Sequence, residues 1–554
     1  MKIKKGFIWL ACGVSLAGCS YTKEQKTEET KKTATTQKLA ISSEAAISTM
    51  TPSLATDATS TLVMNQVYEG LYTLGKDDKF ELGVAASEPK ISDDQTVYTF
   101  TLRQDAKWSN GSPVTADDFV YAWQTLVDPT KASPNADVLF DVVKNAKQIA
   151  NGQAAVETLG VKAIDEHTVE ITLEKPTPYL KSLLSYPVLF PQNRAYVTQQ
   201  GEKYGTDSAH LIYNGAFKLD DWSAVGDNWT YHKNDTYWDH KTVKLNEAKV
   251  TVVKSPSTAI NLFKTGELDV VNKLSGEFVA NYRSEKAFVS VPQFTTFFIK
   301  MNSQRNGKAT ALANLNARQA IAQAFDKKGF VKSILADEST PTDQIIPPGQ
   351  TMMPDGKTDF IKAAAKQDKY LTYAPEKAKA AWEKAKKELK LDQITLQFLT
   401  DDTDSAKRSA EYFQSQLETN LPGLKVEITQ VPFTVRVQRD KAKDYDLELS
   451  GWGTDYRDPL TVLRIFTSTS SLGGVTFNSP EYDRLIQQTR EEFAANPEKR
   501  MTNFIEAQNI VVNKETVLAP IYNRALSVLA NPEVKNLYWH SFGPTYSLKW
   551  AEKD

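Results

Sequence analysis

Hydrophobic and polar residues alternate with a period of two along two short segments of the N-terminal half, 96–103 and 167–173. Such alternation places apolar side chains on one face of an extended chain, so it predicts two half-buried strands. Between these segments, Thr115 precedes a stretch in which Phe119 and Trp123 recur one helical turn apart. A hydroxyl residue in that position is a typical N-cap, and the pattern therefore predicts a capped helix.

The C-terminal half shows the period that is typical of amphipathic helices. Apolar residues form one stripe along 375–390 and another along 405–419. Short apolar segments at 394–399 and 424–428 flank the second stripe, and a strand–helix–strand unit of this spacing pairs its strands in parallel. A further helix is predicted over 255–266, because Pro favours the first turn of a helix and Gly its end. These elements indicate a mixed α/β fold.

The first nineteen residues have the composition of a targeting signal. Lysines precede a short apolar run, 6–17, which is below the roughly 20 residues that a membrane-spanning helix needs. The run leads into Leu16-Ala17-Gly18-Cys19, which resembles the lipobox of bacterial lipoproteins. This resemblance implies cleavage before Cys19 and acylation of its sulfur, whereas an ordinary secretory signal with an incidental cysteine is the alternative. Residues 20–37 are polar and predict a flexible tether.

Composition narrows the possible chemistry. Without its first eighteen residues the chain has 63 basic and 68 acidic residues, which excludes a basic nucleic-acid footprint. Cys12 and Cys19 are the only cysteines, so the processed chain would contain no disulfide, and its length predicts two or more domains. The histidines lack a metal-binding spacing, and neither a phosphate-binding glycine loop nor a nucleophile elbow is found. We therefore expect no metal, no cofactor and no catalysis, and we expect Asp402 and Asp404 to cap the helix at 405–419.

Four stretches of the sequence carry recognisable motifs. They are Val67-Tyr-Glu-Gly-Leu-Tyr72; Tyr98-Thr-Phe-Thr-Leu-Arg103 followed by Trp108-Ser-Asn-Gly-Ser-Pro-Val-Thr-Ala-Asp-Asp-Phe-Val-Tyr-Ala-Trp123; Leu315-Asn-Ala-Arg-Gln-Ala-Ile-Ala322 with Ala324-Phe-Asp326; and Gly451-Trp-Gly-Thr-Asp-Tyr-Arg-Asp-Pro459. In this order and spacing they resemble one family, the family 5 solute-binding proteins of peptide ABC importers, of the oligopeptide-binding type. The resemblance extends from about residue 38 to residue 554.

The resemblance implies a particular α/β fold: the type II fold of periplasmic binding proteins, with two lobes that close about a hinge and an extra domain. A signal peptide over 1–18 and a lipidated tether over 19–37 would precede the globular body. Domain I would comprise residues 38–75, 212–305 and 523–554, domain II residues 76–211, and domain III residues 306–522.

The resemblance also implies a set of ligand-binding residues. Relatives hold the α-amino group of a peptide with an aspartate in a Trp-x-x-Asp-Tyr stretch, which corresponds to Asp455, and a carboxylate facing an ammonium makes a charge-assisted bond. The other implied peptide-binding residues are Gly451, Trp452, Gly453, Thr56, Ala58, Asn302, Ser303 and Tyr522. Structural alternatives are a loop cap for Asp455 and a turn for Asn302. For Trp452 and Tyr522 the alternative is the hydrophobic core, and Trp108 and Trp123 are expected there as scaffold.

Three functions are compatible with these features. The first is a monomeric, lipid-anchored receptor on the outer face of the plasma membrane of a Gram-positive cell, which captures oligopeptides and delivers them to the permease subunits of an ABC importer. The second is a receptor of the same fold that is dedicated to one signalling peptide, or to a non-peptide ligand such as a metal chelate or haem. The third is an enzyme or an adhesin on the same anchor, but a nucleophile with its base and clustered metal ligands are both missing from the sequence.

Overall fold

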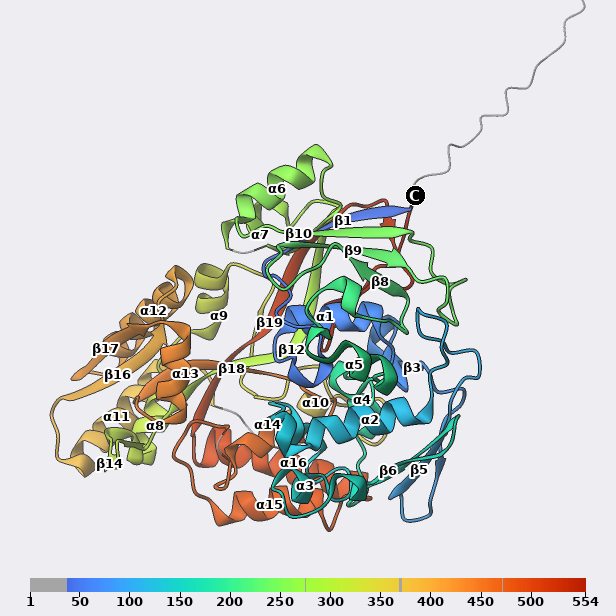
Figure 1. Cartoon of the computed structure of the whole chain (residues 1–554). Coiled ribbons are helices and arrows are strands. Elements are labelled where there is room, and N and C mark those ends of the chain that lie inside the picture. Colours follow the sequence, from blue (N-terminus) through green and yellow to red (C-terminus); the bar gives the residue numbers. More distant parts are fainter. Residues whose placement is uncertain (1–36, 275, 368–370, 471) are drawn as a thin grey trace, which may run out of the picture. The chain divides into compact units, whose positions relative to one another are not determined.

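Eleven strands form one continuous sheet among the residues that the computed structural model describes, 37–274, 276–367, 371–470 and 472–554. Two long strands at its middle, β12 (Phe288–Met301) and β19 (Leu518–Ala530), pair antiparallel. On one side lie β18 (Leu447–Gly453), β16 (Ile394–Asp401) and β17 (Leu424–Val431). On the other side lie β11 (Val270–Leu274), β1 (Lys38–Ser43), β10 (Glu247–Val252), β9 (Asn228–Lys233) and β8 (Phe217–Asp220) (Figure 1).

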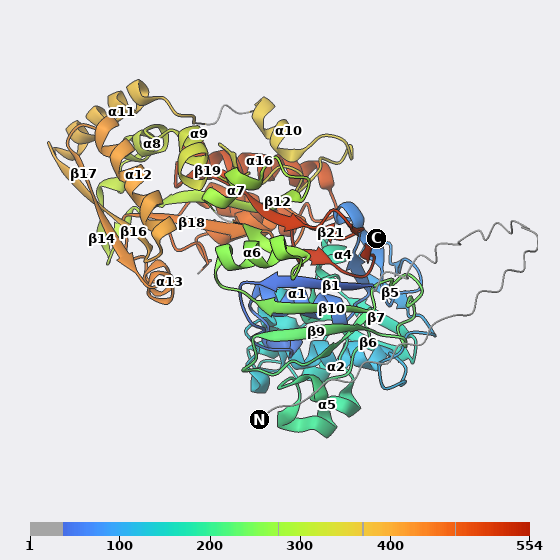
Figure 2. The same ribbon diagram turned by 90° about the horizontal axis from the view of Figure 1, so that it is seen from above.

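Strands of this sheet contribute side chains to two large hydrophobic cores, and each core defines one lobe. The small lobe, residues 302–335 and 375–450, packs α8 (Leu315–Gln323), α11 (Pro375–Leu389) and α12 (Asp404–Asn420) with β16, β17 and β18. The large lobe comprises the described residues of 37–291, 345–367, 454–517 and 526–554, which contain nearly all of the other large core and the small cores around Ile260 and Val528. Figures 1 and 2 show the helices of the small lobe gathered away from β1, β9 and β10.

The large lobe contains a second, four-stranded sheet that confirms the first predicted elements. Strands β4 (Lys90–Ile91), β5 (Val97–Thr101), β7 (Thr168–Thr172) and β6 (Val161–Asp165) pair in that order, and α2 (Ala116–Val127) packs against it. Thr115 begins α2 with a capping box that it shares with Asp118. Phe119 and Trp123 are buried on its inner face, and the buried Trp108 donates from Nε1 to Asp118 Oδ2 at 3.0 Å. Both tryptophans are core residues, as expected.

The predicted strand–helix–strand unit of the C-terminal half is also present. β16 and β17 pair in parallel from Ile394 opposite Leu424, and α12 connects them. One detail was wrong: the hydroxyl of Thr403 caps α12 by accepting from the N–H of Ala406, and Asp404 lies in the first turn. A hydroxyl oxygen satisfies that orphan N–H as well as a carboxylate does.

The remaining elements connect these layers. The other helices are α1 (Ala58–Val67), α3 (Ala146–Ala150), α4 (Leu180–Leu183), α5 (Arg194–Gln200), α6 (Pro256–Thr265), α7 (Glu277–Tyr282), α9 (Lys327–Phe330), α10 (Phe360–Gln367), α13 (Phe433–Lys441), α14 (Leu460–Leu463), α15 (Pro480–Arg490) and α16 (Pro497–Asn509). The eleventh strand of the large sheet, β15 (Thr340–Pro341), pairs antiparallel with β19. The other strands are β2 (Tyr72–Leu74), β3 (Phe80–Leu82), β13 (Gln304–Arg305), β14 (Lys308–Ala309), β20 (Val534–Lys535), β21 (Tyr538–Trp539), β22 (Tyr546–Ser547) and β23 (Glu552–Lys553). As predicted, α6 begins after Ser255 and ends at Gly266.

β12 and β19 carry the chain from one lobe into the other. Their register shifts between Pro292 and Thr296, and again between Phe297 and Phe298. Irregular pairing bends and twists a strand locally, so the sheet changes direction where it passes between the lobes. The predicted three-domain division stays a prediction.

No helix in the described part of the chain is both long and apolar enough to cross a membrane. No group of three or more His, Cys, Asp and Glu side chains is placed to hold a metal ion in the same residues. Cys19 and the implied signal peptide lie outside the described residues.

Candidate functional site

One edge of β18 is open along most of its length. β12 pairs with all of β18, from Leu447 to Gly453, but β16 pairs with it only at Leu447 and Glu448. Beyond Glu448, no described strand pairs with that edge, so backbone groups of 449–453 lack a strand partner there. An extended ligand can add to such an edge as a further strand.

The predicted glycines and Tyr522 shape this strand. A Cβ atom at Gly451 would lie 2.8 Å from the ring of Phe297, whereas one at Gly453 would meet only Thr295 Oγ1, at 3.3 Å. The Phe297 ring stacks on Tyr522 with 4.7 Å between ring centroids, and Tyr522 is buried in the core of the small lobe. Tyr522 therefore supports β18 through Phe297, in agreement with its core alternative.

A cavity of about 410 Å³, which we call cavity 1, lies beside the C-terminal end of β18. Its walls come from residues 135–142, 179–186 and 452–490. Tyr179 stacks on Tyr456 with their ring centroids 4.2 Å apart, so distant parts of the chain form one aromatic wall. Its charged lining residues are Asp137, Asp141, Asp455, Arg464 and Arg490.

Asp455 lines cavity 1 with its side chain half exposed. Its Oδ2 accepts a hydrogen bond from Thr461 Oγ1 at 3.1 Å and lies 3.4 Å from a terminal nitrogen of Arg464. Surrounding protein atoms raise the pKa of this carboxyl by desolvation and the charge of Asp137 adds to the rise, while Arg464 and Thr461 oppose it. The carboxylate remains accessible to a cation in the cavity, which is the chemistry predicted for this residue.

Trp452 lines the same cavity. Its Nε1 atom is buried and has no hydrogen-bond partner among the described residues. A buried donor without a partner costs about 1–3 kcal/mol, and a ligand's acceptor would remove that cost. Trp452 and Asp455 thus line one cavity, and the indole of Trp452 carries a donor without a partner among the described residues.

Thr56 and Ala58 are exposed on either side of Asp57, which caps α1. Asn135, a lining residue of cavity 1, donates from Nδ2 to two carbonyl oxygens of segment 53–55, at 3.2 and 2.9 Å. The segment before Thr56 is therefore tied to the cavity wall, although Thr56 and Ala58 are not among the residues that line it. Their contact with a ligand stays a prediction.

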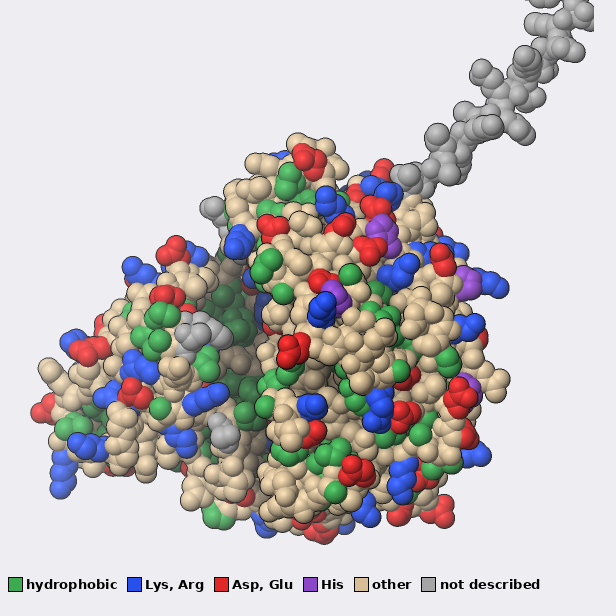
Figure 3. Space-filling view, in the orientation of Figure 1, with side chains coloured by type: hydrophobic (Ala, Val, Ile, Leu, Met, Phe, Trp, Pro, Cys, Tyr) green, Lys and Arg blue, Asp and Glu red, His purple; other side chains and the backbone are tan. Residues whose placement is uncertain are grey.

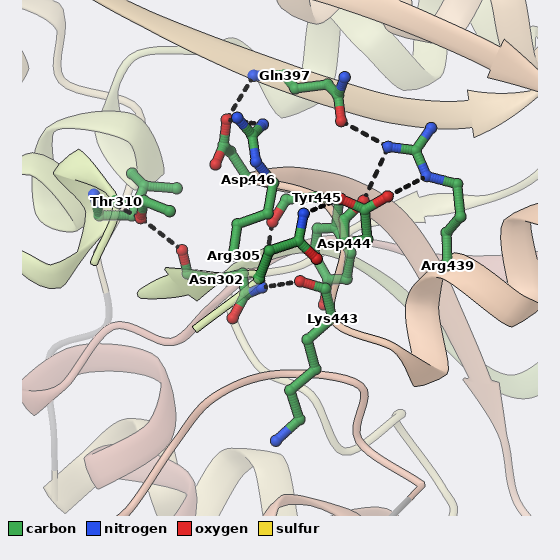
Figure 4. Close-up of polar contacts among 11 residues, drawn as sticks. Asn302, Arg305, Thr310, Gln397, Arg439, Lys443, Asp444, Tyr445 and Asp446 are labelled. Carbon is green, nitrogen blue, oxygen red and sulfur yellow. Dashed lines mark hydrogen bonds and ion pairs between the residues drawn. The ribbon is translucent and has the colours of Figure 1, made fainter. Parts of the chain in front are cut away.

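Asn302 and Ser303 bind other parts of the protein. The fully buried Asn302 donates from Nδ2 to the carbonyl oxygens of Lys443 and Tyr445, at 2.9 and 3.1 Å (Figure 4). Its Oδ1 accepts from the N–H of Thr476, and Ser303 Oγ donates to the carbonyl of the same residue. The structure does not bring this pair to cavity 1. The side chain of Asn302 therefore holds segment 443–445 in place, and contact of Asn302 with a ligand stays a prediction.

A second cavity, of about 210 Å³, lies between the lobes and was not indicated by any motif. Arg408 of α12 and Arg524 of β19 line this cavity 2, and neither forms an ion pair with a described residue. The buried Ser527 Oγ in its lining has no hydrogen-bond partner among the residues described. The arginines come from distant segments, so their proximity depends on the tertiary fold and gives no signal in the sequence.

These features define a class of protein. Two cores joined by two continuous strands, with cavities between distant segments and a hollow between the small and large lobes (Figure 3), are typical of solute-binding proteins that close about a ligand.

Comparison with known proteins identifies the family. Residues 79–474 match the middle region of the bacterial extracellular solute-binding proteins, family 5. The chain belongs to this family and has its two-lobed type II fold with an extra domain. Proteins of this family are transport binding proteins and not enzymes.

Similar proteins cover nearly the whole chain. A dipeptide-binding protein of Lactococcus lactis subsp. cremoris is 32% identical over 555 residues, which cover 99% of this chain and 96% of that protein. A solved structure of Listeria monocytogenes OppA bound to peptide is 40% identical, with a TM-score of 0.79, and covers 94% of this chain and 99% of that one. A structure of the pheromone receptor PrgZ is 34% identical, with a TM-score of 0.79 and coverage of 94% and 100%.

Proposed function

We propose that the protein captures oligopeptides between its two lobes and delivers them to the permease subunits of an ABC importer. The observation that carries this proposal is the open edge of β18 next to the accessible carboxylate of Asp455. A peptide would add to segment 449–453 as a strand, with its α-amino group at Asp455. Trp452 Nε1 would donate to a peptide carbonyl.

The relatives support this proposal. One is a dipeptide-binding protein, and the OppA structure holds a peptide in a fold that this chain shares over 94% of its length. All peptides have a backbone and a terminal amine. A receptor that binds these two features can therefore accept peptides of mixed sequence. The two arginines of cavity 2 outnumber its one carboxylate, Asp337, and would favour a carboxylate of the ligand, such as its C-terminus.

We further infer that the mature protein is anchored to the outer face of the plasma membrane through acyl chains on Cys19. The lipobox-like sequence and the polar segment after it support this anchor, because two or more acyl chains hold a protein stably on a bilayer. Cys19→Ser should release the protein into the medium and abolish incorporation of labelled palmitate. Membrane retention of this variant would contradict the anchor.

A receptor dedicated to one signalling peptide is the second candidate. The likeness to the pheromone receptor PrgZ, at 34% identity over nearly the full length of both chains, favours it specifically.

Ligand identity can be tested on protein that begins at Ser20. Mass spectrometry of the small molecules released on denaturation should detect a mixture of short peptides, whereas one dominant species would support the dedicated receptor. In calorimetric titrations, N-acetylation of a peptide should weaken binding, and Asp455→Asn should weaken it about tenfold to a hundredfold. Asp117→Asn removes an aspartate with a similar arginine partner on an exposed surface and serves as the control. Equal binding by wild type and Asp455→Asn would contradict the proposed amine site.

A further inference from the structure

Three carboxylates and two guanidinium groups line cavity 1, which leaves a net charge of −1. Of its charged lining residues, Asp455 is paired with Arg464, and Asp141 forms an ion pair with Arg490. The fifth, Asp137, is exposed and forms no ion pair or side-chain hydrogen bond with any residue that the structure describes. The lining therefore carries one carboxylate without a counter-ion.

Asp137 lines the same cavity as Asp455, the proposed amine-binding residue, and influences its charge. Its charge contributes to raising the pKa values of both the Asp455 carboxyl and the Arg464 guanidinium. Charges interact across a cavity in this way only over short distances, because water and salt screen them beyond about 10 Å. Asp137 and Asp455 thus form two neighbouring anionic positions in one cavity, carried by different parts of the chain.

The other walls suit a long side chain with a cationic end. Aromatic rings of Tyr179, Tyr186 and Trp452 line the cavity. Such rings pack against methylene groups and attract cations through their faces. The volume of about 410 Å³ leaves room for a complete side chain in addition to an α-amino group.

We propose that Asp137 makes cavity 1 selective for peptides whose first residue is lysine or arginine. The α-amino group lies at Asp455, and the side-chain cation lies at Asp137. This inference rests on the proposed function, since it assigns a preference to the same peptide site. It gives Asp137 the role of a specificity residue and leaves general peptide binding to Asp455 and the edge of β18.

The test compares three peptides that differ only in the first residue. Lys-Ala-Ala, norleucine-Ala-Ala and Glu-Ala-Ala are titrated into wild type and variants by calorimetry at low salt. Norleucine has the methylene chain of lysine without its charge. Wild type should bind the lysine peptide about three- to fivefold more tightly than the norleucine peptide, and the glutamate peptide most weakly.

The variants separate selectivity from binding. Asp137→Asn should remove the lysine preference and leave affinity for the norleucine peptide within about twofold. Asp137→Glu should retain the preference, and Asp117→Asn, which removes an exposed charge outside the cavity, should not change it. Asp455→Asn should weaken all three peptides together. Equal binding of the lysine and norleucine peptides by wild type, or a parallel loss for both in Asp137→Asn, would overturn this inference without affecting the proposed function. Binding of none of the peptides would count against both.

Discussion

Replacing Glu448 with Gln should change how the stability of the protein depends on pH. Glu448 is fully buried in β18, where its carboxyl lies 2.8 Å from Lys300 Nζ and contacts Arg436. Asp440 pairs with the same lysine, and Asp401 pairs with the same arginine. Three carboxyl groups therefore share two cations in a largely buried cluster. Retaining one proton balances the charge, and the most deeply buried carboxyl is the best place for it.

The size of the effect follows from the pKa of Glu448. Burial raises this pKa from an ordinary value of 4.5 to about 7; Lys300 opposes the rise, and the neighbouring Asp440 adds to it. The unfolded chain loses this proton near pH 4.5, whereas the folded protein keeps it until about pH 7. Stability from this group is therefore fully present below pH 4.5 and is lost as the pH rises to 7. At about 1.4 kcal/mol per pKa unit, the loss is about 3 kcal/mol.

Urea unfolding followed by tryptophan fluorescence at pH 5 and pH 8 measures this loss. Gln has nearly the same shape and no proton to lose, so Glu448→Gln should gain most of the 3 kcal/mol relative to wild type between these pH values. Glu427→Gln, on a half-exposed surface of β17, is the control and should change little. Parallel changes in wild type and Glu448→Gln would refute the reasoning. A relative loss at pH 8 would also refute it, because Lys300 and Arg436 would then outweigh burial.

Three further changes test packing, ion pairing and backbone geometry. Gly451→Val brings side-chain atoms against the Phe297 ring, which a Cβ atom alone would approach to 2.8 Å, so the melting temperature should fall with a cost of about 1–3 kcal/mol. An unchanged melting temperature would show that the ring moves freely. Asp458→Ala removes a two-pronged partner from the buried Arg500, at 2.8 and 3.2 Å, and should cost about 3–5 kcal/mol in urea unfolding. A loss below about 1 kcal/mol would mean that Arg500 finds another partner. Gly266→Ala places a side chain at φ +78° with no neighbouring atom within 4 Å, so circular dichroism should report a backbone cost of about 1–2 kcal/mol. No loss would contradict the left-handed end of α6.

The elements that the sequence predicted are those whose signals are local. The capping box of α2, the proline and glycine that bound α6, and the apolar stripe of α11 each lie within about twenty residues, and all three helices were found. The choice of Thr403 over its acidic neighbours as the cap of α12 could not be predicted, because both residue types accept the same hydrogen bond.

The sequence predicted only those cavity residues that lie within a recognisable motif. Asp455 and Trp452 lie in one short motif and line one cavity. Asp137 comes from a segment more than three hundred residues away, and only the tertiary fold brings it to them. Asn302 directly follows β12 and was predicted to contact the ligand. Its side chain instead forms long-range hydrogen bonds to the carbonyl oxygens of Lys443 and Tyr445, which the sequence does not reveal.

The buried charges around Glu448 lie where the pairing of β16 with β18 ends. Glu448 is the last residue of β18 that pairs with β16, and Asp401 is the last residue of β16. Arg436 of α13 binds both carboxyl groups, so its guanidinium links the end of β16 to β18. Loss of Arg436 would remove a shared cation from two carboxyl groups, one of them fully buried. The cluster that sets the pH dependence thus also ties the end of β16 to β18, next to the segment proposed to bind peptide.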